Sequence, residues 1–494
     1  MSQISVNNLT FYYEGSYDNI FEDVSFQIDT NWKLGFVARN GRGKTTFLNL
    51  LLGKEEYRGS ITANVDFDYF PFRVTDREKN TIDIVEDLYP DYEFWRICAE
   101  LTRLHVDSDV LYRPFSTLSN GEQTKVMLAV LFSRENSFLL IDEPTNHLDM
   151  PTREVVKEYL KSKKGFILVS HDRDFLDECV DHILAINKTN IEVCQGNFST
   201  WRENKNRQDE YERSENERLK KDIKRLTEAA RRTAQWADNV EATKIGTKAQ
   251  KYEGSKDHRA YVGEKSRRMQ QRRKNLERRQ EQEIEEKAGL LKNVETADDL
   301  KLFPLRHHKE TLVSVKDLKI VYPGKEIAIP DFTIKNGDRV VLYGANGCGK
   351  TSVIRVLRGF TEYHGMLETA AGMKISYIPQ DAEFLTGKLD DYIAQNDLDT
   401  TLVKTLLRKL DFDRVQFEKN MEDYSGGQKK KVLIAQSLCT QAHLYIWDEP
   451  LNFIDVFSRM QIEELILKFK PTLLMVEHDK TFVEKIATQK VSFI

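Results

Sequence analysis

Short apolar runs alternate with helical patterns in both outer parts of the chain. In the first part, the runs 4–6, 24–28, 34–37, 138–141 and 166–169 have the length of strands, and a helical pattern covers 47–52. Residues from about 304 to 494 repeat this order. Strands that alternate with helices predict an α/β fold with a parallel sheet, and the ligands of such sheets lie at the carboxyl ends of the strands.

The segment 199–303 between these parts has a different pattern. It contains no proline, and apolar residues follow one another at alternating spacings of four and three from Leu219 to Val240, which predicts one seam of a coiled coil. A weaker seam crosses 257–286, and glycines lie between the two stretches. The pattern predicts two antiparallel helices joined by a tip near 241–256. A helix of ~40 residues would be ~60 Å long and would stand clear of the flanking domains.

Composition narrows the class of protein. The 494 residues carry a net charge of −5, and no apolar run approaches the ~20 residues that cross a bilayer. The N-terminus lacks the pattern of a secretory signal, so we expect a cytoplasmic protein. The five cysteines never form a C-x-x-C pair, which argues against a zinc ribbon or a disulfide framework.

Five chemically distinctive residues recur at one offset of 306 positions. The matched pairs are Lys44 and Lys350, Ser119 and Ser425, Asp142 and Asp448, Glu143 and Glu449, and Asp149 and Asp455. The chain therefore holds two copies of one domain, which we place at 1–198 and 304–494.

A phosphate-binding loop begins each copy of the repeat. Residues 344–351 fit the pattern G-x-x-x-x-G-K-[ST], whereas residues 38–45 depart from it because Ala38 replaces the first glycine. In such loops, backbone N–H groups surround the phosphates, the lysine reaches the β- and γ-phosphates, and the threonine hydroxyl ligates Mg²⁺. The candidate ATP-binding residues are Asn40, Gly41, Gly43, Lys44, Thr45 and Thr46 in the first copy, and Gly344, Asn346, Gly347, Gly349, Lys350, Thr351 and Ser352 in the second.

Acidic residues and histidines follow the later strands. Asp142 and Asp448 each end an apolar strand, where they can hold Mg²⁺, and Glu143 and Glu449 directly follow and can polarise the attacking water. His171 and His478 also follow apolar strands and are candidates for contact with the γ-phosphate. A single histidine is more often structural, but two at matched positions favour the functional interpretation.

One departure predicts that the two sites differ. The second copy has Gln380 after Tyr-Ile-Pro, whereas the first copy has Phe72 after Tyr-Phe-Pro. Phenylalanine neither ligates a metal nor accepts a hydrogen bond from water. We expect the first site to coordinate Mg²⁺ less well and to hydrolyse ATP differently. The candidate metal ligands are Thr45, Asp142, Thr351, Gln380 and Asp448.

The chain closely resembles the ABC ATPases, because residues 118–122 and 424–428 are similar to their two signature motifs. The resemblance implies that the signature of each domain closes over nucleotide held by the other. Ser425, Gly427 and Gln428 would then complete the Lys44 site, and Ser119, Gly121 and Glu122 would complete the Lys350 site. It also implies Tyr13 and Tyr322 as platforms for adenine, although either could be an ordinary strand residue.

The middle segment carries a basic surplus. Between Arg218 and Arg279 there are 20 Lys or Arg residues and 8 Asp or Glu residues. Such a run is often only a solvated helix face. Here the positive charge follows both predicted arms, which suits contacts with the phosphate backbone of a nucleic acid.

Two fused ATPase domains with a helical linker resemble the ABC-F family, and residues 40–46 and 447–455 look most like its Lsa group of antibiotic-resistance proteins. The resemblance implies a monomer that binds the exit site of the bacterial 70S ribosome through 23S rRNA and P-site tRNA. It implies protection against lincosamides, streptogramin A and pleuromutilins, with a translation factor for stalled ribosomes and a membrane exporter's ATPase as alternatives. The candidate tip residues are Lys244, Ile245, Lys248 and Tyr252.

Overall fold

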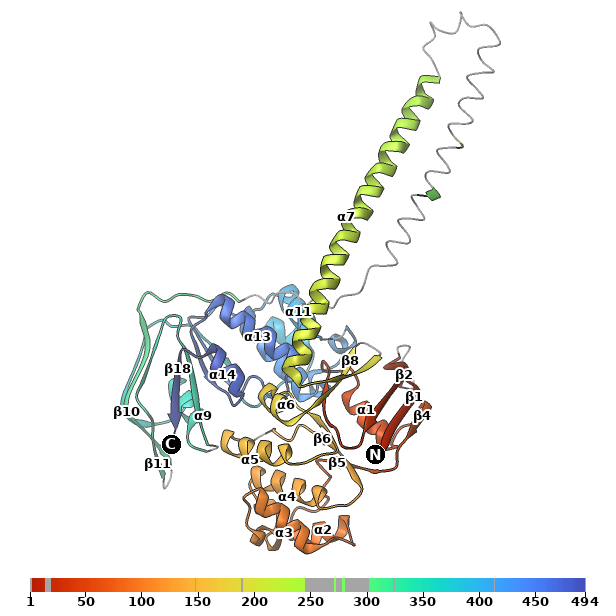
Figure 1. The fold of residues 1–494 in the computed structure, drawn as a ribbon. Coiled ribbons are helices and arrows are strands. Elements are labelled where there is room, and N and C mark those ends of the chain that lie inside the picture. The colour runs from red at the N-terminus through yellow and green to blue at the C-terminus, as the bar shows by residue number, and fades with distance from the viewer. Residues whose placement is uncertain are drawn as a thin grey trace, which may run out of the picture. The chain divides into compact units, whose positions relative to one another are not determined.

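The structure is a computed structural model, and it describes residues 2–13, 19–146, 148–187, 190–244, 271, 278–279, 302–322, 325–345, 347–412 and 414–493. The chain forms two compact units. One contains residues 1–201 together with 297–494, and the other contains residues 202–296. Figure 1 shows the order of the elements along the chain.

The first copy contains two sheets and a group of helices. A six-stranded sheet has the order β5-β6-β7-β3-β8-β9, in which all pairs are parallel except β8 with β9. Its elements and those around it are β1 (Gln3–Phe11), β2 (Phe21–Asp29), β3 (Lys33–Val37), α1 (Lys44–Leu51), β4 (Arg58–Thr62), β5 (Asp66–Phe70), α2 (Thr81–Leu88), α3 (Phe94–Arg103), η1 (Ser108–Tyr112), η2 (Phe115–Thr117), α4 (Asn120–Phe132), β6 (Ser137–Asp142), α5 (Met150–Lys161), β7 (Phe166–Val169), α6 (Arg173–Cys179), β8 (His182–Asn187) and β9 (Asn190–Gln195).

The predicted strands of the first copy all form, but not all join the parallel sheet. The runs 4–6 and 24–28 lie in β1 and β2, which pair antiparallel and form a separate sheet with β4. Only nine residues separate β1 from β2, and a parallel pair needs a crossover of a dozen or more residues. The expectation of one parallel sheet was therefore wrong for these two runs.

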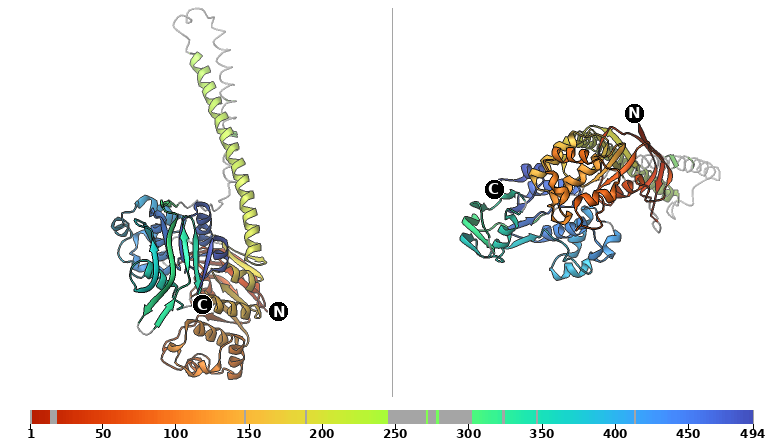
Figure 2. Two further views of the ribbon diagram at one scale, coloured as in Figure 1. Left: turned by 90° about the vertical axis from the view of Figure 1, so that its left-hand side faces the viewer. Right: turned by 90° about the horizontal axis from the view of Figure 1, so that it is seen from below.

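The second copy repeats this arrangement. Its parallel sheet has the order β15-β16-β17-β13-β18, and β10, β11, β12 and β14 form an antiparallel sheet, whose strands lie side by side in Figure 2. The elements are β10 (Thr311–Tyr322), β11 (Lys325–Ala328), β12 (Phe332–Lys335), β13 (Arg339–Gly344), α9 (Lys350–Leu357), β14 (Tyr363–Thr369), β15 (Ile375–Ile378), α10 (Leu389–Gln395), α11 (Thr400–Lys409), η4 (Arg414–Glu418), η5 (Met421–Asp423), α12 (Gly426–Cys439), β16 (Leu444–Asp448), α13 (Val456–Phe469), β17 (Leu473–Val476), α14 (Lys480–Ile486) and β18 (Gln489–Phe493).

Each copy also has a helical part that carries a signature. In the first copy, α2, α3 and α4 pack around Leu101, Leu111 and Leu128, which are all fully buried. In the second copy, α10, α11 and α12 enclose Leu407, Leu438 and neighbouring core residues. Burial of each such leucine contributes roughly 1.5–3 kcal/mol, so these layers hold the starts of α4 and α12 firmly in place.

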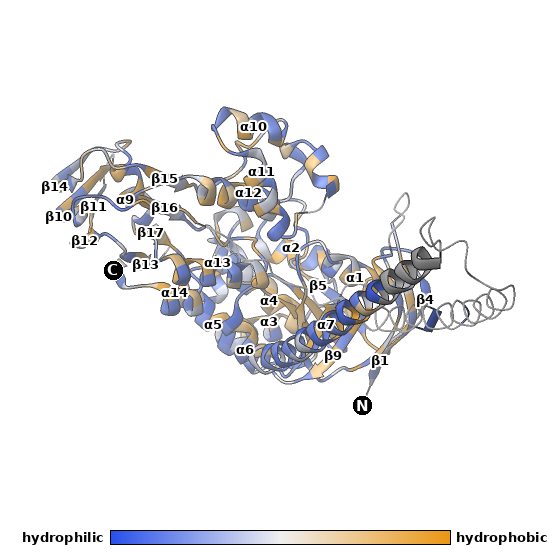
Figure 3. Ribbon diagram, turned by 90° about the horizontal axis from the view of Figure 1, so that it is seen from above, coloured by the Kyte–Doolittle hydropathy of each residue, from blue (hydrophilic) through white to orange (hydrophobic). Residues whose placement is uncertain are grey.

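A single long helix, α7 (Phe198–Lys244), begins the middle segment, as its apolar seam predicts. It is hydrophilic along most of its described length (Figure 3). The second predicted arm and most of the tip lie outside the described residues. Among the described helices, none combines the length and the apolar character that crossing a membrane requires.

Candidate functional site

Three neighbouring strands bring the candidate residues of the first copy to one sheet edge. Strand β7 pairs with both β6 and β3, and Asp142 at the end of β6 lies beside Val169 at the end of β7. The phosphate loop follows β3, and His171 follows β7. In the second copy, β16, β17 and β13 place Asp448, His478 and the second loop in the same relation.

Each phosphate loop ends in a glycine that caps a helix. Gly43 (φ 86°) precedes α1, and Gly349 (φ 106°) precedes α9. A Cβ atom at either position would lie 2.6–2.8 Å from an isoleucine methyl group, and L residues rarely adopt such φ angles. Glycine therefore allows the loop to curl around the start of each helix, where unpaired N–H groups favour an anion.

The two loops differ at their first residue. Gly344 has φ 154°, and a Cβ atom there would lie 2.6 Å from the carbonyl oxygen of Phe493. Ala38 is buried and is not among the residues with positive φ. The first loop therefore tolerates a methyl group where the second does not. The Nζ atoms of Lys44 and Lys350 both bond carbonyl groups of their own loops, at 2.8 Å from Ala38 and 2.9 Å from Gly344.

The two candidate adenine platforms lie against the phosphate-loop helices. The hydroxyl of Tyr13 lies 2.9 Å from Oγ1 of Thr46, and the hydroxyl of Tyr322 donates to Oγ of Ser352 at the same distance. Tyr13 is 43% exposed, so its ring presents a face to solvent beside the loop. The structure thus places both tyrosines beside the phosphate-loop helices, and their role as adenine platforms stays a prediction.

Both candidate catalytic glutamates have a strained backbone. Glu143 has φ 52° and Glu449 has φ 46°, in the left-handed region that non-glycine residues rarely adopt. In each copy, the glutamate N–H bonds the last residue of the adjacent strand, Val169 or Val476. Strain of this kind persists where the surrounding structure enforces it, and it is common at functional sites.

In the second copy, amide groups surround the glutamate. Oε2 of Glu449 accepts hydrogen bonds from Gln380 (3.1 Å) and Asn452 (2.6 Å), and Nε2 of His478 lies 3.7 Å from Oε1. Burial acts to raise the pKa of Glu449, but His478 and the Asn452 amide outweigh it, so the pKa lies below its usual value. Glu449 is therefore ionised at neutral pH.

In the first copy, the corresponding glutamate has fewer partners. Oε1 of Glu143 lies 3.3 Å from Nε2 of His171, yet it is buried and has no hydrogen bond to any residue that the structure describes. Phe72, at the position of Gln380, packs against the hydrophobic core. Burial and the neighbouring Asp142 raise the pKa of Glu143 to about 8. Burial and the charge of Lys44 hold the pKa of His171 well below its usual range, so this histidine is neutral.

The two strand-end aspartates also differ. Oδ1 of Asp448 lies 3.5 Å from the hydroxyl of Thr351, and its Oδ2 is buried without a partner. Oδ2 of Asp142 instead accepts a hydrogen bond from the hydroxyl of Tyr69 at 2.9 Å. An unpaired carboxylate oxygen beside a threonine hydroxyl fits Mg²⁺, which prefers oxygen ligands. The donor set at Asp448 therefore fits this ion, whereas one carboxylate oxygen of Asp142 already accepts a hydrogen bond from Tyr69.

The second copy completes the surroundings of the Lys44 loop. Nδ2 of Asn40 donates to the carbonyl oxygen of Phe453 at 3.1 Å, and a Cβ atom on Gly427 would lie 3.4 Å from the same Nδ2. That Cβ atom would also lie 2.5 Å from the Phe453 carbonyl oxygen, so only glycine fits at this position. Burial lowers the pKa of Lys44, and the charge of Asp455 from the second copy opposes that effect.

The first copy in turn borders the Lys350 loop. A cavity of about 290 Å³ has walls from both copies. Asn120, Leu148 and Arg153 belong to the first copy, and the remaining lining residues are Gly347, Gly349, Lys350, Thr351, Ser352, Gln380, Glu449, Asn452 and His478. The structure therefore brings the start of α4, next to Ser119 and Gly121, to the second phosphate loop.

Each signature serine caps the helix that follows it. The hydroxyl oxygen of Ser119 accepts from the N–H of Glu122, and Ser425 accepts from Gln428, with the reciprocal side-chain bond present in both cases. These capping boxes fix the first turns of α4 and α12. In the first copy, the Ser119 hydroxyl also donates to the carboxylate of Glu122 (2.8 Å).

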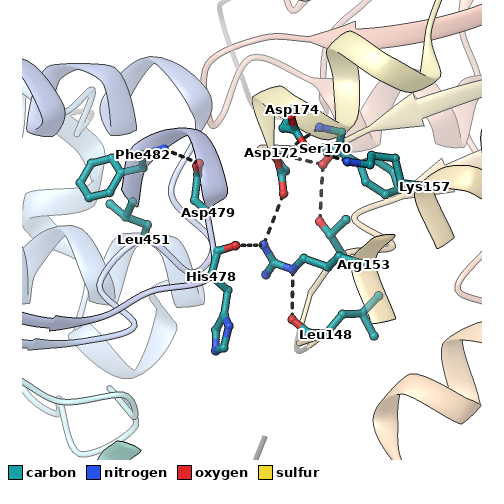
Figure 4. Close-up of polar contacts among 12 residues, drawn as sticks. Leu148, Arg153, Lys157, Ser170, Asp172, Asp174, Leu451, His478, Asp479 and Phe482 are labelled. Carbon is teal, nitrogen blue, oxygen red and sulfur yellow. Dashed lines mark hydrogen bonds and ion pairs between the residues drawn. The ribbon is translucent and has the colours of Figure 1, made fainter. Parts of the chain in front are cut away.

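Several residues at these sites were not among those that the motifs predict. Tyr69 and Asn452 contact the acidic residues described above, and Arg153 from α5 donates to the carbonyl oxygen of His478 at 3.1 Å (Figure 4). Arg153 and Arg459 stand at the same offset of 306 residues as the five motif pairs, so the repeat itself could have identified them. Asn346, Ile245, Lys248 and Tyr252, and the side chain of Lys244, lie outside what the structure describes.

The family model described as "ABC transporter" matches residues 21–146 and 328–452, which together are just over half of the chain. The chain therefore belongs to the ABC transporter family, as an ATP-hydrolysing member of its F branch, ABC-F. The predictions of an ABC-F ATPase and of two ABC domains joined by a helical segment are confirmed.

Similar proteins span almost the entire chain. The ribosome protection protein VmlR of Bacillus subtilis is 26% identical over 97% of this chain and 85% of its own length. The ATP-binding protein Uup of Buchnera aphidicola is 25% identical over 99% and 80%, and ABC transporter F family member 5 of Arabidopsis thaliana is 24% identical over 99% and 75%. Among solved structures, the archaeal ribosome recycling factor aABCE1 shares the fold, with a TM-score of 0.62 and 18% identity. The superposition covers 98% of this chain and 87% of the aABCE1 chain.

Proposed function

We propose that this chain is an ATP-gated clamp that binds the bacterial ribosome and protects its peptidyl-transferase centre from antibiotics. One observation carries the proposal. A relative named a ribosome protection protein matches 97% of the chain, which includes both ATPase copies and the segment between them. The classes of drug are those of the Lsa-like group: lincosamides, streptogramin A and pleuromutilins.

The chain's own residues would bind and cleave ATP between the copies. Lys44 and Lys350 would hold the phosphates, while Ser425 with Gly427, and Ser119 with Gly121, would close each site from the opposite copy. Mg²⁺, when bound, neutralises charge on the β- and γ-phosphates. Thr351, Asp448 and Gln380 would hold it in the second site, and Thr45 with Asp142 in the first.

Glu449 is the better placed of the two general bases. Its carboxylate is ionised and is oriented by Gln380 and Asn452, so it can accept a proton from an attacking water molecule. His478 would contact the γ-phosphate, and loss of that phosphate after hydrolysis would let the copies separate. Hydrolysis would therefore release the protein from the ribosome.

The middle segment would contact RNA. Lys220, Lys221, Lys224 and Arg225 are all exposed on α7, which suits salt-dependent contacts with phosphate groups. In this proposal the segment enters the tRNA exit site, contacts 23S rRNA and P-site tRNA, and brings Lys244, Ile245, Lys248 and Tyr252 near the drug pocket. A 100-fold loss of drug affinity would need only ~2.7 kcal/mol.

The clamp is tested by sedimentation with ribosomes in the presence of ATP. The double variant Glu143→Gln with Glu449→Gln should stay bound, because it closes without hydrolysing ATP. Glu78→Gln with Glu484→Gln is the matched control, since it changes one exposed glutamate in each copy. Free exchange of the catalytic double variant in ATP would refute the clamp.

Protection itself is tested by translation in vitro with a lincosamide. The intact chain should restore synthesis, and a version that lacks residues 215–280 should not. Changing Lys220, Lys221, Lys224 and Arg225 to glutamine should weaken ribosome binding and flatten its dependence on salt. The second candidate, implied by the same ABC-F resemblance, is a translation factor that acts on stalled ribosomes without a drug. Ribosome binding without any effect on the drug would select that alternative.

A further inference from the structure

Arg153 joins two loops that belong to different copies. Its Nη1 atom donates to the carbonyl oxygen of His478 at 3.1 Å and contacts Oδ2 of Asp172 at 3.3 Å, while its Nε donates to the carbonyl oxygen of Leu148 at 3.0 Å. Figure 4 shows the guanidinium group between Asp172 on one side and His478 on the other. One side chain therefore contacts the loops of both candidate histidines, because Asp172 directly follows His171.

The surroundings of Arg153 make this contact well defined. Its side chain is only 13% exposed, and that of Asp172 is 9% exposed. Asp172 is also fixed by its own helix, because its Oδ1 accepts from the N–H of Phe175 at the start of α6. A charged donor between a fixed carboxylate and a carbonyl oxygen forms strong, directional bonds, and removing it takes this donor from Oδ2 of Asp172 and from the carbonyl oxygen of His478.

The matching arginine of the second copy makes different contacts. Arg459 donates to Asp479 at 3.1 Å, to the carbonyl oxygen of Ile454 at 2.9 Å and to that of Leu451 at 3.0 Å, all within its own copy. Within the described part of the chain, no bond joins Arg459 to the carbonyl group of His171. Of these two arginines, only Arg153 has a hydrogen bond to the opposite histidine loop among the described residues, whereas Arg459 acts on Asp172 of the opposite copy through its charge.

We propose that Arg153 is a positioning residue that couples the two ATP sites. It holds the backbone of His478 in the orientation that faces the Lys350 loop, and it does so only while the two copies are closed. Its second contact, with Asp172, links this state to the loop of His171. Closure over ATP in one site therefore favours closure in the other. The inference rests on the ATP-driven closure that belongs to the proposed function.

This coupling can be tested without a ribosome by measuring how ATP closes the two copies of the isolated protein. One fluorophore is placed on an exposed position of each copy, in the Glu143→Gln and Glu449→Gln background so that ATP is not consumed. Energy transfer is then measured as ATP is added. In Arg153→Ala we expect the ATP concentration at half-maximal closure to rise about 10-fold, which corresponds to ~1.4 kcal/mol of lost coupling. We also expect the Hill coefficient of closure to fall towards one.

Two further variants separate coupling from a general loss of structure. Arg77→Ala should leave the Hill coefficient at the value of the parent protein, because Arg77 is an exposed arginine of the first copy. Arg153→Lys keeps the charge but cannot bond both partners in the same geometry. Its ATP concentration at half-maximal closure should therefore lie between those of Arg153→Ala and the parent protein, while its Hill coefficient should stay close to that of Arg153→Ala. It also provides the measurement if Arg153→Ala does not fold.

A double-mutant cycle identifies the partner. If Arg153 acts through Asp172, then Arg153→Ala combined with Asp172→Asn should change the Hill coefficient no more than Arg153→Ala alone. A parent-like midpoint and Hill coefficient in Arg153→Ala would overturn the coupling while leaving the clamp intact. Absence of ATP-driven closure in the parent protein would instead overturn the clamp, and the coupling with it.

Discussion

The Lys44 site and the Lys350 site contain the same motifs at the same spacing, but their acidic residues have different neighbours. Glu449 accepts bonds from Gln380 and Asn452 and has a lowered pKa, whereas the pKa of Glu143 is raised to about 8. A shared motif therefore fixes the position of a carboxylate, while the side chains around it set its protonation. We therefore expect the Lys350 site to hydrolyse ATP faster than the Lys44 site.

The largest expected effect is on turnover when each glutamate is removed. Glu449→Gln should lower ATP turnover by about 100-fold or more, the range for loss of a general base, because an ionised carboxylate disappears. Glu143→Gln should lower it only a few-fold, because Glu143 is already protonated at neutral pH. Steady-state phosphate release from the two single variants measures this, and equal losses would contradict the asymmetry.

A smaller effect should follow from making the Lys350 site resemble the Lys44 site. Gln380→Phe removes the 3.1 Å hydrogen bond to Glu449, and the loss of about 1.4 kcal/mol should lower turnover about 10-fold. Phe72→Leu is the control, since it keeps an apolar side chain against the core and should change turnover little. Unchanged turnover in Gln380→Phe would show that Asn452 alone orients the glutamate.

The interface beside His171 should make stability depend on pH. Burial and the facing carboxylate of Asp479 raise the pKa of Asp172 to about 6, against 3.8 as the ordinary value, although Arg153 and Arg459 oppose the shift. The stability that the protonated carboxyl contributes is complete below pH 3.8 and is lost as the pH rises through 6.

Asp172→Asn removes this titration and keeps a side chain that can cap α6. The melting temperature of the variant relative to wild type should therefore rise between pH 4 and pH 7, by the equivalent of about 1–2 kcal/mol. Asp91→Asn, at an exposed position, should show no such trend. A constant difference across this range would show that Asp172 titrates normally.

The smallest expected effect concerns Mg²⁺ in the Lys44 site. The hydroxyl of Tyr69 occupies Oδ2 of Asp142, whereas Oδ2 of Asp448 has no partner. Tyr69→Phe should free that oxygen, so ATP binding at the Lys44 site should need about fivefold less Mg²⁺, equivalent to ~1 kcal/mol.

Titration calorimetry in a Lys350→Ala background measures the Mg²⁺ requirement of the Lys44 site alone. Tyr377→Phe is the matched variant in a Lys44→Ala background, because the Tyr377 ring lies against the guanidinium of Arg358. That variant should leave the Mg²⁺ requirement of the Lys350 site unchanged. An identical response of both sites would show that the Tyr69 hydroxyl does not compete with the ion.

Much of the fold could be predicted from local patterns. Apolar runs gave the strands, and the loops after β3 and β13 were recognisable because glycines with positive φ are needed there. The placement of β1 and β2 in a separate sheet was missed, since strand length and apolarity do not specify which strand is the neighbour. The partners of Asp142 were missed for a related reason: Tyr69 lies 73 residues away in the chain.

The order of residue types along the chain is enough to identify a duplicated ATPase with a basic helical segment between the copies. Phosphate binding and hydrolysis need particular residue types at short, fixed spacings, and a repeat displays them twice. The differences between the copies, in contrast, arise from how the chain folds. Burial, the Oε1 atom of Glu143 that has no hydrogen bond among the described residues, and the contact of Arg153 with His478 depend on residues far apart in the chain, and no spacing rule predicts them.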